Sequence, residues 1–202
     1  MTQPLAIQAL AAAAFVALTD ASWGITTAAD HVPSRPGLYA IYGDTQAWVD
    51  LGLESNPNQP LYIGKAERSL VSRDLNAHFA AKPNSIARTG NSTVRRSFAA
   101  LLRGSLELRA VPRNLAKRER FANYSLAEGG GARLSAWMHS RLTLAVWPAP
   151  DEIPVPLGDV ETAMILRFTP PLNLDKNPSK FGHLRQARAE MAAEAARWRP
   201  DT

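Results

Sequence analysis

Two short aromatic segments, residues 37–42 and 61–65, constrain the fold of this chain more than any other part of its sequence. In each segment residues of different character alternate, which is the period-two pattern of a β-strand with two distinct faces. Three of the chain's four tyrosines lie in these strands. An antiparallel pair is the simplest topology, and it allows Tyr39 and Tyr62 to project from the same side of the sheet. Core packing is the alternative role for both, and we expect it for Tyr42.

The length and composition of the chain are those of one globular domain, which we expect to span residues 1–202. The 202 residues are 46% apolar and 20% charged, which is typical of a sequence that folds alone. The chain contains no cysteine, which excludes a disulfide framework and a zinc site built from thiolates. Cysteine usage leaves the cellular compartment open.

The N-terminal segment is apolar from Leu5 to Leu18 apart from Gln8. An export signal has a lysine or arginine before its apolar segment, and none precedes this one. The segment is also shorter than the roughly 20 residues that span a bilayer. We expect a helical extension over residues 1–33 that packs on the domain or forms a dimer contact, with a cleaved export signal as the alternative. The expected location is therefore cytoplasmic, without a membrane partner, and the oligomeric state stays open with a dimer as one option.

Positive charge is concentrated between Arg88 and Arg120, where nine basic residues face two acidic ones, while the whole chain carries a net charge of +5. A segregated cationic segment attracts polyanions by counterion release, and nucleic acid is the commonest such partner. A solvated arginine-rich surface is the alternative. The candidate nucleic-acid-binding residues are Arg88, Arg95, Arg96, Arg113, Lys117, Arg118 and Arg120.

Glu161 lies on an apolar helical stripe, because Leu157, Ile165 and Phe168 fall on the same face of a helix. A desolvated carboxylate must be paired, since an unpartnered one is costly or stays protonated. An arginine or a hard cation is therefore expected to face it. Mg²⁺ is favoured if a phosphate shares the site, because this ion takes one or two protein carboxylates and fills its other positions with water and phosphate oxygens.

Lys65 and Arg73 are candidates for binding that phosphate, because charge on a phosphoryl transition state requires fixed cations or a metal. A guanidinium also offers a bidentate match. Taken alone, Lys65 would be a solvated strand end and Arg73 a solvated helix face. A tyrosine hydroxyl can orient or deprotonate a water, but its pKa of about 10 requires a neighbouring cation for ionisation at neutral pH.

The rest of the chain alternates between helical and extended patterns. We expect a loop at 43–60, helices at 69–81, 92–102 and 132–141, strands at 106–111 and 143–147, a helix carrying Glu161 that stops before Pro170, and an amphipathic C-terminal helix within 179–202.

These residues together resemble the GIY-YIG nucleases. Gly37-Leu38-Tyr39 is similar to the first signature element, with leucine in place of isoleucine, and Tyr62-Ile63-Gly64 matches the second. Arg73 resembles the family's catalytic arginine and Glu161 its metal-binding glutamate. Pro171-Leu172-Asn173 is similar to the segment whose asparagine supports the site. The five elements occur in the family's order.

The resemblance implies an α+β domain over residues 34–178, with a three-stranded, largely antiparallel sheet and one divalent metal, usually Mg²⁺ and otherwise Mn²⁺. It implies hydrolysis of a phosphodiester bond by water. In that mechanism Tyr39 activates the water, Tyr62 and Arg73 orient the phosphate, and Glu161 holds the metal. Gly64 and Asn173 support the site, and Lys65 is a weaker catalytic candidate.

Two departures from the family concern spacing. The step of 23 residues from Tyr39 to Tyr62 indicates an inserted loop, and the 88 residues from Arg73 to Glu161 contain a basic insertion at about 88–127. We hypothesise that this insertion grips the nucleic acid.

A third departure concerns His78, a weaker catalytic candidate. It follows Arg73 by five residues, about 140° further around an ideal helix. His78 therefore shares a face with Val71 and Leu75, and its role stays open between catalysis and core packing.

The predicted function is that of a metal-dependent endonuclease acting on DNA, in restriction, repair or mobile-element processing, with RNA open as a substrate. A nucleic-acid-binding protein of the same fold with little or no cleavage activity is the alternative. A structural protein, in which Glu161 pairs with an arginine, is a third hypothesis.

Overall fold

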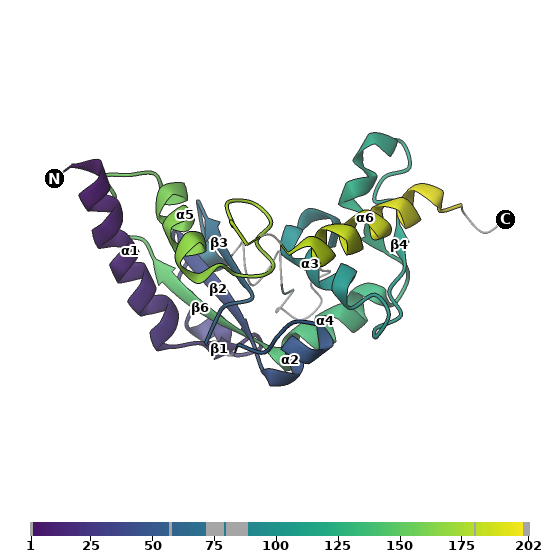
Figure 1. The fold of residues 1–202 in the computed structure, drawn as a ribbon, viewed down its shortest axis with the longest axis horizontal. Coiled ribbons are helices and arrows are strands. Elements are labelled where there is room, and N and C mark those ends of the chain that lie inside the picture. The colour runs from purple at the N-terminus through teal and green to yellow at the C-terminus, as the bar shows by residue number, and fades with distance from the viewer. Residues whose placement is uncertain (1, 57, 72–78, 80–88, 180, 200–202) are drawn as a thin grey trace.

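The two aromatic segments form neighbouring antiparallel strands of a four-stranded sheet (Figure 1). β2 spans Gly37–Gly43 and β3 spans Tyr62–Ala66. The other side of β2 pairs with β6 (Leu142–Pro148), which in turn pairs with β1 (Trp23–Gly24). The strand order β1-β6-β2-β3 leaves β3 at an edge of the sheet. The computed structural model describes residues 2–56, 58–71, 79, 89–179 and 181–199.

The prediction of a mixed α/β fold with a largely antiparallel sheet is confirmed, but the sheet has four strands where the sequence predicts three. The additional strand, β1, contains only two residues and is too short to produce an alternating pattern. It forms because Trp23 and Gly24 pair with Leu144 and Thr143 of β6. The register of a longer neighbouring strand thus decides its structure.

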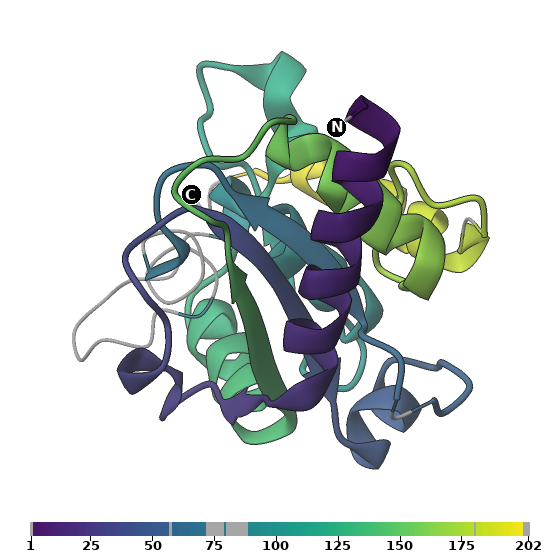
Figure 2. The ribbon, with the colours of Figure 1, turned by 90° about the vertical axis from the view of Figure 1, so that its left-hand side faces the viewer.

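Helices cover both faces of the sheet. α1 (Gln3–Asp20) and α5 (Leu157–Phe168) lie on one face, where they pack against residues such as Leu38 and Ile63 (Figure 2). α4 (Gly130–Arg141) contributes to the core on the other face, which contains Tyr39 and its neighbours. Both faces of β2 are therefore buried, as expected for a central strand. Full burial of a large apolar side chain contributes about 1.5–3 kcal/mol to the stability of the fold.

The N-terminal helix α1 is shorter than the sequence predicts. It ends at Asp20, and β1 and a 3₁₀-helix, η1 (Ala28–Asp30), follow within the segment expected to be helical. By length and composition alone, α1 is long and apolar enough to cross a membrane. Core helices of soluble proteins and signal sequences near an N-terminus meet the same criteria. In the structure it packs on α5 and β6, and the Tyr42 hydroxyl donates a hydrogen bond of 2.9 Å to the Leu18 carbonyl. Burial raises the pKa of Tyr42 to about 12, so this donor stays protonated at neutral pH.

The segment predicted as a loop at 43–60 contains a helix, α2 (Thr45–Asp50). Its N-terminus is capped by Asp44, whose Oδ1 accepts a hydrogen bond of 2.7 Å from the Ala47 backbone amide. Such caps satisfy a backbone donor that the first helical turn leaves unpaired. The glycines and prolines of this segment favour a loop, but its cap and the burial of Trp48 stabilise a short helix there.

The basic insertion and the C-terminal helix pack together into what we call the second lobe (Figure 1). The strand predicted at 106–111 is reduced to its last two residues, because β5 offers β4 only a two-residue partner. Only residues 70–71 of the helix predicted at 69–81 are described as helical. The second lobe comprises η3 (Thr89–Asn91), α3 (Thr93–Leu101), β4 (Ala110–Val111), η4 (Arg118–Asn123), β5 (Ser125–Leu126) and α6 (Gly182–Arg197).

Candidate active site

Tyr39 and Tyr62 lie on the same face of the sheet, as the alternating pattern predicts. Their rings are 6.1 Å apart between centroids and tilted by 34°. In the strand register Tyr39 lies opposite Gly64, so the Tyr39 ring crosses the position that a side chain at Gly64 would occupy. A β-carbon at Gly64 would lie 2.5 Å from Cζ of Tyr39. Gly64 is therefore required by this close approach, and Tyr39 is fully buried beneath β3 while Tyr62 is partly exposed.

Glu161 lies in α5 and forms an ion pair with Lys176, whose Nζ is 2.8 Å from Oε2 of the carboxylate. The side chain of Glu161 is 12% exposed and that of Lys176 is 32% exposed. The sequence predicts an arginine or a metal ion as the partner, and the structure supplies a lysine instead. A carboxylate held at this depth beside a cation is already placed to bind positive charge.

Lys176 adopts a left-handed backbone conformation with φ of 60°. Its backbone amide donates a hydrogen bond of 3.0 Å to Oδ1 of Asp175. Left-handed conformations of residues other than glycine are uncommon and carry strain of about 1–2 kcal/mol. The sequence does not predict Lys176 as the partner of Glu161. No local sequence pattern indicates its backbone conformation or its contact with a helical residue 15 positions earlier.

Asn173 ties the loop that carries Lys176 to the free edge of β3. Its Oδ1 accepts a hydrogen bond of 2.9 Å from the Ile63 amide, and its Nδ2 donates one of 2.8 Å to the Ile63 carbonyl. Beside it, the Leu172 amide donates a hydrogen bond of 3.0 Å to the Leu61 carbonyl. The asparagine side chain thus completes the pairing that a further strand would otherwise provide.

Replacing Asn173 with alanine is expected to lower the free energy of unfolding by about 2 kcal/mol, because it leaves the buried Ile63 amide and carbonyl without partners. Urea denaturation of the variant and the parent measures the difference. Asn58→Ala is the matched control, since Asn58 is exposed. Equal losses in the two variants would contradict a bracing role for Asn173.

Lys65 follows Gly64 on β3 and therefore projects from the opposite face to Tyr62. Its Nζ pairs with Oε1 of Glu67 at 2.5 Å and lies beside Gly158 in the first turn of α5. The structure thus brings Lys65 close to the helix of Glu161, whereas it places the two tyrosines on the other side of β3.

The predicted site residues fall into two described groups. Tyr39, Tyr62 and Gly64 form the first group. The second group is Glu161 and Asn173, because the ion-pair partner of Glu161, Lys176, follows Asn173 by three residues in the chain. β3 connects the groups, because Tyr62 and Ile63 are adjacent in it and Asn173 binds Ile63. Three predicted residues, Arg73, His78 and Arg88, lie outside the described residues.

The predicted nucleic-acid-binding residues divide into buried and exposed members. Arg95 is fully buried and donates hydrogen bonds to the Gly131 carbonyl and the Ser135 hydroxyl, and burial lowers its pKa to about 10. Arg96 is 7% exposed. Neither guanidinium therefore belongs to an exposed basic surface, because that of Arg95 packs against α4 and that of Arg96 bonds to the Gly90 carbonyl. Arg113, Lys117 and Arg120 line a surface pocket, and the side chain of Arg118 is not described.

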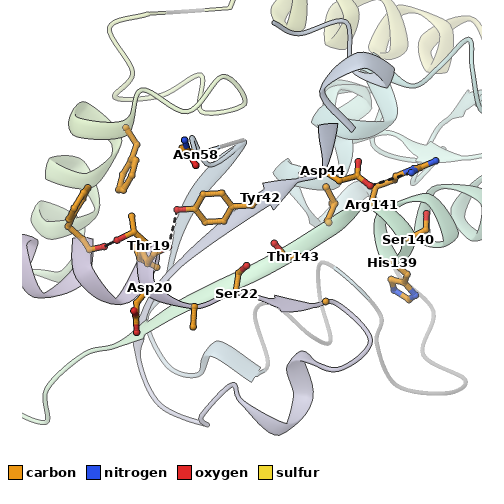
Figure 3. Close-up of a pocket in the computed structure, with 17 residues that line it drawn as sticks. Thr19, Asp20, Ser22, Tyr42, Asp44, Asn58, His139, Ser140, Arg141 and Thr143 are labelled. Atoms are coloured by element: carbon orange, nitrogen blue, oxygen red, sulfur yellow. Dashed lines mark hydrogen bonds and ion pairs between the residues drawn. The ribbon is translucent and has the colours of Figure 1, made fainter. Parts of the chain in front are cut away.

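A cleft of about 680 Å³ lies where β2 ends and β6 begins (Figure 3). Tyr42 points into it from β2, and Asp44 and Arg141 form an ion pair of 3.3 Å at its margin. None of the predicted catalytic residues among those described lines this cleft. The cleft is therefore separate from the described residues that are predicted to take part in the reaction.

The donor set around Glu161 fits a magnesium ion better than a zinc ion. Among the described residues there is no cluster of three or more histidine, cysteine, aspartate or glutamate side chains. Zinc sites use three or four such ligands, whereas Mg²⁺ is bound by one or two carboxylates, with waters and phosphate oxygens as its other ligands. One carboxylate whose present partner is an ammonium group meets that smaller requirement.

Comparison with protein families found a match to the GIY-YIG catalytic domain over residues 48–190, which is more than half of the chain. The matched range contains β3, α5 and Asn173 and begins after β2, so the first signature element lies outside it. Comparisons with curated proteins and with solved structures found no match. The chain belongs to the family of GIY-YIG catalytic domains.

Proposed function

We propose that this nuclease-family protein is a metal-dependent endonuclease that hydrolyses phosphodiester bonds in DNA. The observation that carries the proposal is the double hydrogen bond between Asn173 and Ile63, which attaches the loop facing Glu161 to the strand that carries Tyr62. A carboxylate able to hold a metal and a hydroxyl able to contact a phosphate are thereby fixed to the same edge of the sheet. We also propose a cytoplasmic location, one domain over residues 1–202, and no membrane partner.

We assign the contact with the substrate to Tyr62 and the positioning of its ring to Tyr39, because Tyr62 is partly exposed and Tyr39 is buried against it. The Tyr62 hydroxyl can donate a hydrogen bond to a phosphate oxygen or orient a water molecule. Activation of the water by Tyr39 itself would require the ring to become accessible. Arg73, and Lys65 as a weaker candidate, supply positive charge toward the phosphate in this proposal.

Glu161 would hold the Mg²⁺ or Mn²⁺ ion, with water and phosphate oxygens as its remaining ligands. When bound, such an ion stabilises the negative charge that develops on the phosphate and the leaving oxygen. Lys176 pairs with the same carboxylate. Lys176 and the metal are therefore competing partners of Glu161.

Replacing Lys176 with methionine is expected to tighten metal binding by about fivefold, because a partly exposed ion pair contributes up to about 1 kcal/mol. Isothermal titration with Mn²⁺ in the absence of nucleic acid measures the affinity directly. Lys176→Arg, which keeps the competing charge, should bind Mn²⁺ as the parent does. Weaker binding in Lys176→Met would mean that Lys176 supports the metal site instead of competing for it.

Incubation with supercoiled plasmid tests the proposed activity. We expect nicked or linear DNA in the presence of Mg²⁺ or Mn²⁺ and none after EDTA is added. A labelled RNA of matched sequence, tested in parallel, separates DNA from RNA as the substrate. Binding of both nucleic acids without cleavage under any of several metals would favour the alternative, a nucleic-acid-binding protein of the same fold. That alternative draws on the burial of Tyr39 and the pairing of Glu161.

A further inference from the structure

The second lobe contains a small pocket of about 140 Å³ whose lining is rich in hydrogen-bond donors. A cavity of about 10–15 Å³ is enough to hold one water molecule, so this volume leaves ample room for a phosphate group. No carboxylate lines the pocket, which is formed by Arg113, Asn114, Lys117, Arg120 and Asn123.

One lining residue, Arg113, shares a backbone acceptor with a buried arginine, Arg96. Nη1 of Arg96 donates a hydrogen bond of 2.7 Å to the Gly90 carbonyl, and Nη1 of Arg113 donates one of 3.4 Å to the same oxygen. Arg96 is 7% exposed, and its Nε has no hydrogen-bond partner among the residues that the structure describes. Burial lowers the pKa of Arg96, and the charges of Arg188 and Arg113 lower it further. Arg96 is therefore repelled by two neighbouring guanidinium groups in this corner of the lobe.

The described part of the chain provides little negative charge to offset that repulsion. Arg96, Arg113, Lys117 and Arg188 form no ion pair with a described carboxylate. Among the described carboxylates Arg120 approaches only that of Glu119, at 3.9 Å, and both of these side chains are largely exposed. Exposed pairs of this kind contribute little. An anion in the pocket would relieve the repulsion that the protein leaves uncompensated.

The geometry of the lining favours an anion with several acceptor oxygens. Oδ1 of Asn114 accepts a hydrogen bond of 2.9 Å from the Ala116 amide, so the oxygen is used and the NH₂ group remains to donate. Arg113 is held in place because its Cδ packs against Gly90, where an added β-carbon would approach it to 2.7 Å. Fixed charged donors bind phosphate oxygens through short, strong hydrogen bonds.

We propose that this pocket binds a phosphate group of the nucleic-acid strand at a place separate from the bond that is cut. The proposal rests on the proposed function for the kind of ligand, but the pocket shares no residue with the candidate active site. The strand would then be held at two points, one at the edge of β3 and one at η4. A backbone phosphate and a terminal 5′-phosphate offer the same chemistry to the pocket.

Binding of inorganic phosphate tests the pocket without any cleavage assay. Isothermal titration at constant ionic strength should give a phosphate affinity for the parent that falls at least about tenfold in Arg113→Gln/Lys117→Gln. Arg185→Gln/Arg197→Gln is the matched control, because it removes the same charge from exposed positions of α6. The control should retain the parent's affinity. Equal losses in both double variants, or no phosphate binding by the parent, would overturn the proposal.

The single variant Lys117→Gln separates loss of phosphate binding from loss of the fold. It should fold normally, because the Lys117 side chain is exposed and forms no ion pair with a described residue. It should keep the parent's melting temperature and still bind phosphate several-fold more weakly. Unchanged phosphate affinity in this variant would count against Lys117 as a ligand and against the pocket.

Oligonucleotides distinguish the two sources of phosphate. Fluorescence anisotropy without divalent metal compares a DNA strand bearing a 5′-phosphate with the same strand bearing a 5′-hydroxyl. If the pocket binds an internal phosphate, Arg113→Gln/Lys117→Gln weakens both strands alike and the salt dependence of binding becomes shallower by about two counterions. If it binds a terminal phosphate, only the phosphorylated strand loses affinity. Unchanged affinity of the variant for both strands would overturn the proposal. Binding of both strands by the parent without any cleavage of DNA would count against the proposed nuclease alone.

Discussion

Replacing Glu161 with glutamine is expected to reduce DNA cleavage on the order of 10³-fold. The substitution preserves the size of the side chain and removes its charge, so the site loses its one described carboxylate partner for a cation. A bound metal contributes several kcal/mol to stabilising a phosphoryl transition state, and each 1.4 kcal/mol or so corresponds to a tenfold change in rate. The initial rate of nicking of supercoiled plasmid at saturating Mg²⁺ measures the effect.

Asp159→Asn provides the control for this substitution, because Asp159 lies in the same helix, loses the same charge and forms no ion pair with a described residue. Its cleavage rate should stay within a fewfold of the parent's. Mn²⁺ titration of Glu161→Gln should also show weaker binding, which separates a metal-binding role from loss of the fold. Cleavage by Glu161→Gln at the parent's rate would refute the assignment of the metal to this residue.

Replacing Gly64 with alanine is expected to lower the free energy of unfolding by about 1–3 kcal/mol, the usual range for overpacking a well-filled core. The new methyl group would lie 2.5 Å from Cζ and 2.9 Å from Cε1 of Tyr39. The ring cannot swing aside at low cost, because Tyr39 is fully buried and packs against Tyr62. The displaced ring should also shift Tyr62, and a misplacement of about 1 Å can reduce a reaction rate roughly 10²-fold.

Gly104→Ala is the control, since an added β-carbon at Gly104 meets no atom within 4 Å. Urea denaturation and plasmid cleavage, measured on both variants, separate the loss of stability from the loss of activity. We expect Gly64→Ala to be impaired in both assays and Gly104→Ala in neither. A Gly64→Ala protein with the parent's stability and cleavage rate would mean that the close approach of Tyr39 to β3 is not needed.

Patterns with a local physical cause predicted most of the fold. Alternation identified β2 and β3, and the apolar stripe around Glu161 identified α5. β1 could not be predicted, because a strand of two residues depends wholly on its partner. α2 was not predicted, because the glycines and prolines around it indicate a loop more strongly than Asp44 indicates a helix cap.

The site was predictable where one element determines it and not where distant elements meet. The shared face of Tyr39 and Tyr62 follows from the alternation of two strands. The pairing of Glu161 with Lys176 joins a helix to a loop with unusual backbone geometry, and no sequence pattern encodes it. Arg95 was predicted to bind nucleic acid because it lies in a segregated cationic segment, yet it packs against α4 and is fully buried.

The hydrogen bonds between Asn173 and Ile63 also set an order of events during synthesis. The two residues are 110 positions apart, so the outer edge of β3 has no partner from this loop until that much more chain has been made. At about 5–20 residues per second, the delay amounts to roughly 5–20 seconds. Throughout this interval β3 presents unpaired backbone groups of the kind that recruit strands from other chains. Aggregation of nascent chains should therefore be most sensitive to conditions before Asn173 is translated. A chain truncated before that residue should be markedly less soluble than the chain of residues 1–202.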